Sequence, residues 1–194
     1  MTGFATVPNG TAQVVVNTYA SIYFSSASVD FGTGNVNATV GNCSVSTIPN
    51  WANEGCISFS KVNNGFTVEN DGNTNLSIDL QSNVTGATFI GVTGPKFLWN
   101  VTVNESNSCY NVSNGRDNVV EPNTSTFCAS DDNSTAANCG SNFESVSTSY
   151  KNVCPRLRYE TPNDALNIDI NVSIPSNAPS GGKYALLTIR GTTA

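Results

Sequence analysis

The N-terminal stretch of this chain carries no charge. No Asp, Glu, Lys or Arg occurs before Asp30, while Val, Ile, Tyr and Phe are frequent in residues 2–24. An uncharged, β-prone segment at the exposed end of a chain is a template for pairing with other strands, so we expect a partner to cover it. The breaker residues at 8–10 divide it into a leading piece, 2–7, and a longer piece, 11–24.

Two arrangements can cover this segment. In the first, both pieces pair inside their own subunit as the opening strands of a β-sandwich. In the second, the leading piece leaves its subunit and completes the sheet of an identical neighbour, which is strand donation between copies. Residues 1–10 would then form a donor extension, with contacts from Gly3, Phe4, Ala5, Thr6 and Val7. Polar residues interrupt the longer piece, so it is not expected to span a membrane.

The composition narrows the classes of function. The net charge is −6, and the eight Lys and Arg residues are scattered, so no basic patch is expected to bind nucleic acid. Histidine is absent, which removes the common serine and cysteine triads and most catalytic zinc sites. The carboxylates lie in no catalytic motif, and we expect no enzyme. Residues 131–133 offer oxygens to Ca²⁺ but lack the spacing of an EF-hand, and residues 70–73 are a weaker candidate, so no cofactor is predicted.

The cysteines indicate disulfides rather than a metal site. The six Cys contain no C-x-x-C spacing and have no histidines beside them, a pattern typical of a secreted or cell-surface protein in an oxidising setting. Six cysteines allow fifteen pairings, and spacing cannot choose among them. Our preferred set is Cys43 with Cys56, Cys109 with Cys154, and Cys128 with Cys139.

Asparagine-linked glycans are the expected modification. Asn-x-Ser/Thr triplets, which are acceptor signals, begin at eleven Asn residues. Three are set aside, because the Asn42 triplet contains a cysteine and because Asn75 and Asn171 can point inward from strands. The candidates are Asn9, Asn37, Asn83, Asn100, Asn104, Asn111, Asn123 and Asn133.

Alternation of apolar and polar residues predicts an all-β fold, either a sandwich or a jelly roll. No window of twelve or more residues has helical periodicity. The turn dipeptide Asp71-Gly72 predicts a hairpin between the strands at 65–70 and 75–80. The other expected strands lie at 28–32, within 35–48, and at 56–60, 97–104, 156–160, 165–174 and 183–191.

Residues 105–154 differ in texture from the rest of the single domain, 1–194. They hold four of the six cysteines and few aliphatic residues, which predicts a disulfide-stapled insertion. The two tryptophans lie outside it. Trp99 alternates with apolar residues and is predicted to lie in the core, whereas Trp51 lies in a disulfide-closed loop and could contact a glycan or a neighbouring subunit.

Three strings carry a family resemblance: SVDFG, FTVENDGNTNLSIDL and NIDINVSIPSNAPSGGKYALLTI. With the opening strand they resemble archaeal surface proteins and the jelly-roll subunits of archaeal pili and threads, which are similar to the bacterial matrix-fibre family of TasA and camelysin. The resemblance covers mainly residues 11–32, 65–81 and 165–191. It implies a polymer in which the N-terminal strand of one subunit fills a groove in the next. The cysteine-rich insertion departs from the simplest members of that group.

These observations give three hypotheses of function. The first is a structural subunit of a secreted, N-glycosylated extracellular filament, assembled head to tail from identical subunits by strand donation, with a role such as cell adhesion. The second is a surface adhesin or carbohydrate-binding module, which would be monomeric. The third is a viral capsid or spike jelly roll, which would close into shells.

Overall fold

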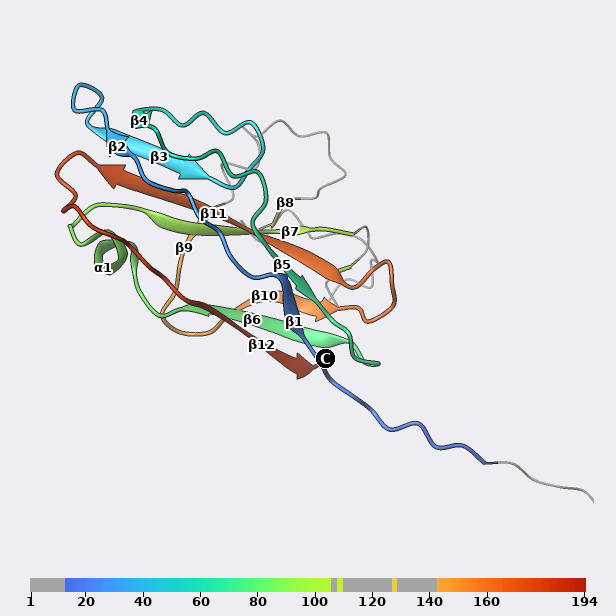
Figure 1. Ribbon diagram of the computed structural model, residues 1–194. Helices are drawn as coiled ribbons and strands as arrows, with labels where there is room; N and C mark the ends of the chain where they lie inside the picture. Colours follow the sequence, from blue (N-terminus) through green and yellow to red (C-terminus); the bar gives the residue numbers. More distant parts are fainter. Residues whose placement is uncertain (1–12, 106–107, 110–126, 129–142) are drawn as a thin grey trace, which may run out of the picture.

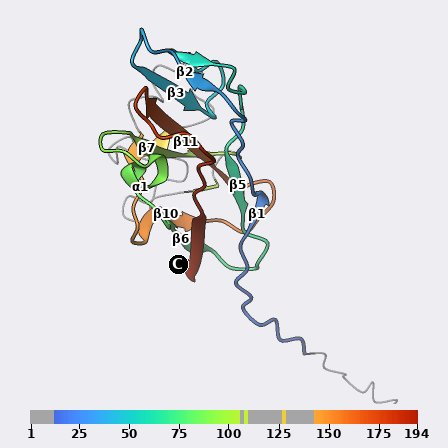
Figure 2. The ribbon, with the colours of Figure 1, turned by 60° about the vertical axis from the view of Figure 1, so that its left-hand side comes forward.

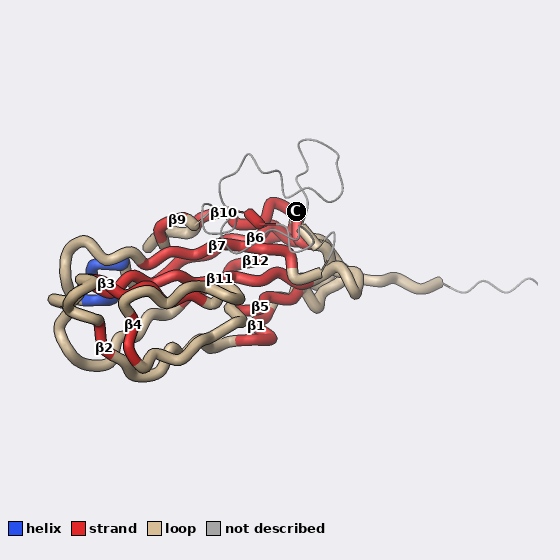
Figure 3. Tube along the Cα trace, turned by 90° about the horizontal axis from the view of Figure 1, so that it is seen from above, coloured by secondary structure: helices blue, strands red, loops and turns tan. Residues whose placement is uncertain are grey.

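A computed structural model describes residues 13–105, 108–109, 127–128 and 143–194. These residues form an all-β sandwich, as the alternation of apolar residues predicts (Figure 1). Seen from above, its strands lie side by side along the length of the body (Figure 3). The third expected disulfide, Cys128 with Cys139, lies outside the residues whose side chains are described.

The larger sheet is built around β11, its longest strand. Its order is β1-β5-β11-β7-β8, with β3 also pairing with β11 and β9 with β7. The pairs are antiparallel except for β7 with β8. The strands are β1 (Tyr23–Ser26), β3 (Asn42–Ser46), β5 (Phe66–Glu69), β7 (Phe97–Val103), β8 (Phe127–Cys128), β9 (Glu144–Ser145) and β11 (Ala165–Pro175).

The smaller sheet has the order β10-β6-β12. Its strands are β10 (Lys151–Leu157), β6 (Leu76–Ser82) and β12 (Leu187–Thr193), and a separate short pair joins β2 (Asn35–Val36) to β4 (Cys56–Ile57). One short helix, α1 (Gly86–Ile90), lies outside the predicted elements. Thr85 caps it, because its side chain accepts a hydrogen bond from the backbone of Thr88, and Gly91 ends it with φ 85°.

The core lies between the two sheets. Alternate residues of β6 are buried, while the residues between them are only partly covered, which is the pattern of a strand with one buried face. Across from them lie Trp99 and Val101 of β7 and Ile168 of β11, all 0–1% exposed. The prediction that Trp99 belongs to the core is therefore confirmed.

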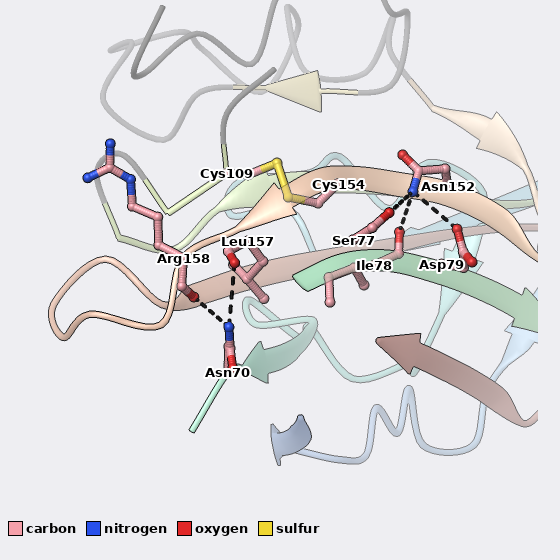
Figure 4. Close-up of a disulfide and its surroundings, with 9 residues drawn as sticks. All are labelled: Asn70, Ser77, Ile78, Asp79, Cys109, Asn152, Cys154, Leu157 and Arg158. Atoms are coloured by element: carbon pink, nitrogen blue, oxygen red, sulfur yellow. Dashed lines mark hydrogen bonds between the residues drawn. A yellow bond between two sulfur atoms is a disulfide. The ribbon is translucent and has the colours of Figure 1, made fainter. Parts of the chain in front are cut away.

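The predicted hairpin between residues 65–70 and 75–80 is wrong. β5 belongs to the larger sheet and β6 to the smaller one, so the turn carries the chain from one layer to the other. The buried side chain of Asn70 holds this corner (Figure 4), because its amide nitrogen donates to the carbonyls of Thr74 at 2.9 Å and Arg158 at 3.0 Å. Both strands bury one face in the same core, so alternation alone does not distinguish a hairpin from a crossing.

Several further strand boundaries differ from the sequence prediction: the strand expected at 56–60 is only Cys56–Ile57, and the one expected at 156–160 is Lys151–Leu157. Residues 28–32 form no strand, and the last strand begins at Leu187 rather than at residue 183. The expected insertion also ends too late, because residues 151–154 already belong to β10 and Cys154 is fully buried. Residues 151–154, which the composition assigns to the insertion, therefore belong to a strand of the smaller sheet.

Two predicted disulfides are confirmed. One joins Cys43 to Cys56, and the other joins Cys109 to Cys154. Figure 4 shows the second bridge beside β10, close to Leu157. It ties the chain that leaves β7 of the larger sheet to a strand of the smaller sheet.

Candidate functional site

The segment before β1 projects from the body of the molecule. Figures 1, 2 and 3 all show it running away from the sandwich. The strand expected over residues 11–24 is wrong for residues 13–22, since the first described strand begins at Tyr23, and residues 11–12 lie outside the described part. Val14, Val15 and Val16 are 86, 72 and 79% exposed, and among the described residues no strand pairs with them. Residues 13–20 are thus an uncharged segment that the described part of the fold leaves exposed.

The proposed donor residues Gly3, Phe4, Ala5, Thr6 and Val7 lie outside the described residues. The described part of the extension begins at Gln13. Strand donation by residues 1–10 therefore stays a prediction.

One side chain fixes where the projecting segment leaves the body. Asn73, in the turn between β5 and β6, accepts a hydrogen bond from the backbone N–H of Tyr19 at 2.6 Å and donates to the carbonyl of Asn17 at 2.9 Å. Its own backbone N–H donates to the carbonyl of Tyr19 at 2.9 Å. Gly72 beside it leaves no room for a side chain, because a Cβ atom there would collide with the backbone of Tyr19. We call these contacts the Asn73 clamp.

Two edge strands lie on the same side of the sandwich. β12 ends the smaller sheet and β1 ends the larger one. Ile22, which directly precedes β1, lies close to β12, because a Cβ atom on Gly191 would lie 3.2 Å from its Cγ2. Among the described strands, only β6 pairs with β12. In the described part of the chain, β12 therefore has one backbone edge without a strand partner.

Carboxylates gather at the end of the sandwich from which the segment leaves. Tyr23 of β1 donates to Oε2 of Glu69 at 2.6 Å, and this hydrogen bond raises the pKa of Tyr23. Desolvation raises the pKa of Glu105 above its ordinary value, and the side chain of Asp164 raises it further by hydrogen bonding and by its charge. The backbone N–H of Asp164, which donates to Oε2 of Glu105 at 2.9 Å, works in the opposite direction.

This pair of carboxyl groups gives a pH-dependent prediction. Because the folded-state pKa of Glu105 is raised, protonation favours the folded state, and that stabilisation is lost as the pH rises through the raised value. Gln at this position does not titrate, and its amide can donate to Asp164. We therefore expect Glu105→Gln to flatten the dependence of the unfolding midpoint on pH in the range just above the ordinary carboxyl pKa of about 4.3. Thermal unfolding across this range measures the effect. The exposed Glu54→Gln is the control, and parallel curves for wild type and Glu105→Gln would refute the prediction.

The structure separates the described glycan candidates. Asn83 and Asn104 are exposed, and Asn37 is half-buried. In each of the three the amide oxygen accepts a hydrogen bond, from Leu186, Asn167 and Thr39 respectively. Among the described residues, none is a hydrogen-bond acceptor for these amide nitrogens, to which a glycan would be attached.

Asn100 is a correction to the glycan candidates. It lies in β7 and is 0% exposed, so the folded chain has no room for a sugar there. The triplet gives no information about burial, since acceptor signals occur by chance in a chain rich in Asn, Ser and Thr. Asn9, Asn111, Asn123 and Asn133 lie outside the described residues.

The contacts of Trp51 involve both its ring and its N–H group. The indole nitrogen donates to Oγ of Ser44 at 3.2 Å, and the ring packs edge-on against Phe143 with 6.1 Å between centroids. Both side chains are half-buried. This pairing could not be predicted from the sequence, because Trp51 and Phe143 are far apart along the chain. Two stretches of the sequence are candidate calcium sites. Residues 70–73 form the corner at Asn70 and the Asn73 clamp described above, and residues 131–133 lie outside the described part.

Comparison with protein families, with curated proteins and with solved structures found no match for this chain. In the described part of the chain, no helix is long and apolar enough to cross a membrane.

Proposed function

We propose that this chain is the subunit of a secreted, N-glycosylated extracellular filament, in which the N-terminal segment of each copy adds a strand to the next. The observation that carries the proposal is the projecting, uncharged segment with Val14, Val15 and Val16 exposed. Backbone hydrogen bonds would supply much of the affinity of such an added strand, and its alternate side chains would set the register.

The edge strand β12 is the proposed acceptor. It offers seven residues, Leu187–Thr193, whose free edge is about 23 Å long. Fully extended, residues 2–16 span about 50 Å, so the segment has enough length to leave its own clamp and cover this edge on a neighbour. Because the donor and acceptor are different surfaces, the contact is heterologous, and it builds an open polymer where the rotation between neighbouring copies does not close a ring.

Glycans and disulfides fit the same setting. The two confirmed disulfides are typical of proteins that fold in an oxidising compartment. Asn83 and Asn104 are the exposed acceptor candidates, and sugars on them would supply solubility to a body with only 11% charged residues.

Electron microscopy of the purified full chain tests the proposal, together with sedimentation analysis of its size. Filaments with a constant axial repeat are the expected result. Monodisperse monomers under all conditions would overturn the proposal and favour a monomeric binding module. Closed shells would favour a capsid instead.

The Asn73 clamp gives a prediction for the geometry of this filament. Asn73→Ala removes two of the hydrogen bonds that hold Asn17 and Tyr19, so the segment can leave the body in many directions. We expect the filaments to lose their regular axial repeat, while the free energy of unfolding falls by no more than about 1 kcal/mol, because the lost bonds are exposed. Averaged electron micrographs measure the repeat.

A matched change distinguishes this effect from the loss of any surface amide. Asn63 is exposed and far from the clamp in the chain, so Asn63→Ala should leave the filament unchanged. Gly72→Ala should act like Asn73→Ala, because its Cβ atom would displace Tyr19. Ordered filaments from both clamp variants would contradict the prediction.

A further inference from the structure

The outer face of the larger sheet holds a polar cluster that the proposed assembly does not use. Asn100 of β7 and Asp169 of β11 are partners in the antiparallel register, so their side chains lie on the same face. Their neighbours Trp99 and Ile170 point to the opposite face, into the core. Asn171 follows Asp169 by two residues on the same face as Asp169.

Asn100 is the unusual member of the cluster. Its side chain is 0% exposed, yet neither its amide nitrogen nor its amide oxygen has a hydrogen-bond partner among the described residues. Buried amides in folded proteins nearly always have partners, because an unsatisfied polar group is costly to bury. The unpaired amide of Asn100 therefore suggests a bound ligand that contacts its nitrogen or its oxygen.

Asp169 beside it is a carboxylate without a basic partner in the described part of the chain. Its Oδ1 accepts a hydrogen bond from Oγ1 of Thr47 at 2.7 Å, and the same hydroxyl accepts from the backbone of Ile170 at 2.9 Å. Among the described residues, the ion pairs involve other carboxylates, Glu144 and Asp79. Thr47 thus orients one carboxylate oxygen of Asp169 and leaves the other without a donor from the described residues.

An aromatic pair crosses this face next to the cluster. Trp51 donates to Ser44 of β3, and Asn171 donates to the same hydroxyl at 3.3 Å. Phe143, which contacts Trp51, directly precedes β9, and β9 pairs with β7. The two rings thus connect the β3 side of the face to the β7 side, beside Asn171.

We propose that Asn100, Asp169 and Asn171 bind a hard cation, Ca²⁺, through their side-chain oxygens, with water completing its shell. Carboxylate and amide oxygens are the ligands that Ca²⁺ prefers. The described residues contain no group of three or more His, Cys, Asp or Glu side chains that could hold a metal, and Asp169 is the one carboxylate of this ligand set. This ligand set gives weak affinity, about 1 mM, in the range of extracellular calcium sites. The site is independent of strand donation.

Calcium titration of the full chain after dialysis against EDTA tests the site. We expect the unfolding midpoint to rise by about 4 °C at about 10 mM Ca²⁺. Tb³⁺ should also bind, with luminescence excited through tryptophan and displaced by Ca²⁺. No shift in the midpoint and no displaceable Tb³⁺ signal would overturn the proposal.

Two variants test the ligands, and a third is their control. Asp169→Asn retains an acceptor for Thr47 but removes the charge, and it should abolish the response to Ca²⁺. Asn100→Leu should also abolish it, and in EDTA should raise the midpoint because the buried amide is gone. Asp30→Asn removes an exposed carboxylate elsewhere and should respond like wild type. A full Ca²⁺ response in Asp169→Asn or in Asn100→Leu would contradict the assignment.

Discussion

A chain that begins at Asn17 will fold into a stable monomer and form no filaments. The deletion removes the exposed valines at 14–16 and everything before them, but it retains the Asn73 clamp and the whole sandwich. Because the valines are exposed and unpaired with any described strand, their loss should change the free energy of unfolding by less than about 0.5 kcal/mol. Circular dichroism and thermal unfolding check the fold, and electron microscopy with sedimentation checks the assembly.

A substitution that adds a charge tests the same segment without shortening the chain. Val15→Lys in the full chain keeps the length of the segment but places an ammonium group in the pairing region, which disfavours strand addition. It should lower the yield and length of filaments without changing the unfolding midpoint. Fibres of normal length from the truncated chain would show that the segment is not the donor.

The missing segment can also be supplied separately. A synthetic peptide of residues 2–16 should bind the truncated monomer and protect the backbone amides on the free edge of Leu187–Thr193 from hydrogen exchange, as expected of an added strand. Protection along β1 instead would move the acceptor to the edge of the larger sheet. No binding would remove strand addition as the mode of assembly.

The strands with a single buried face were the most predictable part of the fold. Buried apolar residues alternate along both β7 and β11, so residues 97–104 and 165–174 could be assigned as strands from alternation alone. These residues are Phe97, Trp99 and Val101 in β7, and Leu166, Ile168, Ile170 and Val172 in β11. The crossing between the sheets at residues 65–80 could not be predicted, because alternation shows that a strand has a buried face but not which strand lies beside it. The corner depends on Asn70, whose buried hydrogen bonds reach the distant residues Leu157 and Arg158.

The candidate sites were predictable only in part. Absence of charge identified the N-terminal segment, but composition cannot show whether such a segment pairs with its own sheet, and only the fold shows that residues 13–20 are exposed. The cluster of Asn100 and Asp169 gave no signal in the sequence, since the two residues are brought together only by the register of β7 with β11. The short run 131–133 is the more visible candidate in the sequence because its acidic residues are adjacent.

Replacing Cys109 and Cys154 by Ala will destabilise the chain more than the loss of the N-terminal segment or of the shorter disulfide. The bridge closes a sequence separation of 45 residues, which on the chain-entropy estimate contributes about 4 kcal/mol. Both cysteines are also buried, at 3 and 0% exposure. For a chain of this size the unfolding midpoint should fall by about 8 to 16 °C, measured by calorimetry under oxidising conditions.

The bridge between Cys43 and Cys56 provides the comparison that tests the physical reason. Its separation is 13 residues, and the same estimate gives about 3 kcal/mol. The longer bridge also secures a junction between layers: next to it Cys109 pairs with Leu157 in an isolated β-bridge, and the carbonyl of Ser108 accepts a hydrogen bond from the backbone of Arg158 at 2.9 Å. Its loss should therefore loosen β10 from the larger sheet and expose β10 amides to hydrogen exchange, whereas loss of the shorter bridge should affect only the region around β3 and β4. An equal or larger loss of stability in the Cys43 and Cys56 variant would show that loop length and the junction of the sheets do not determine the contribution of these disulfides.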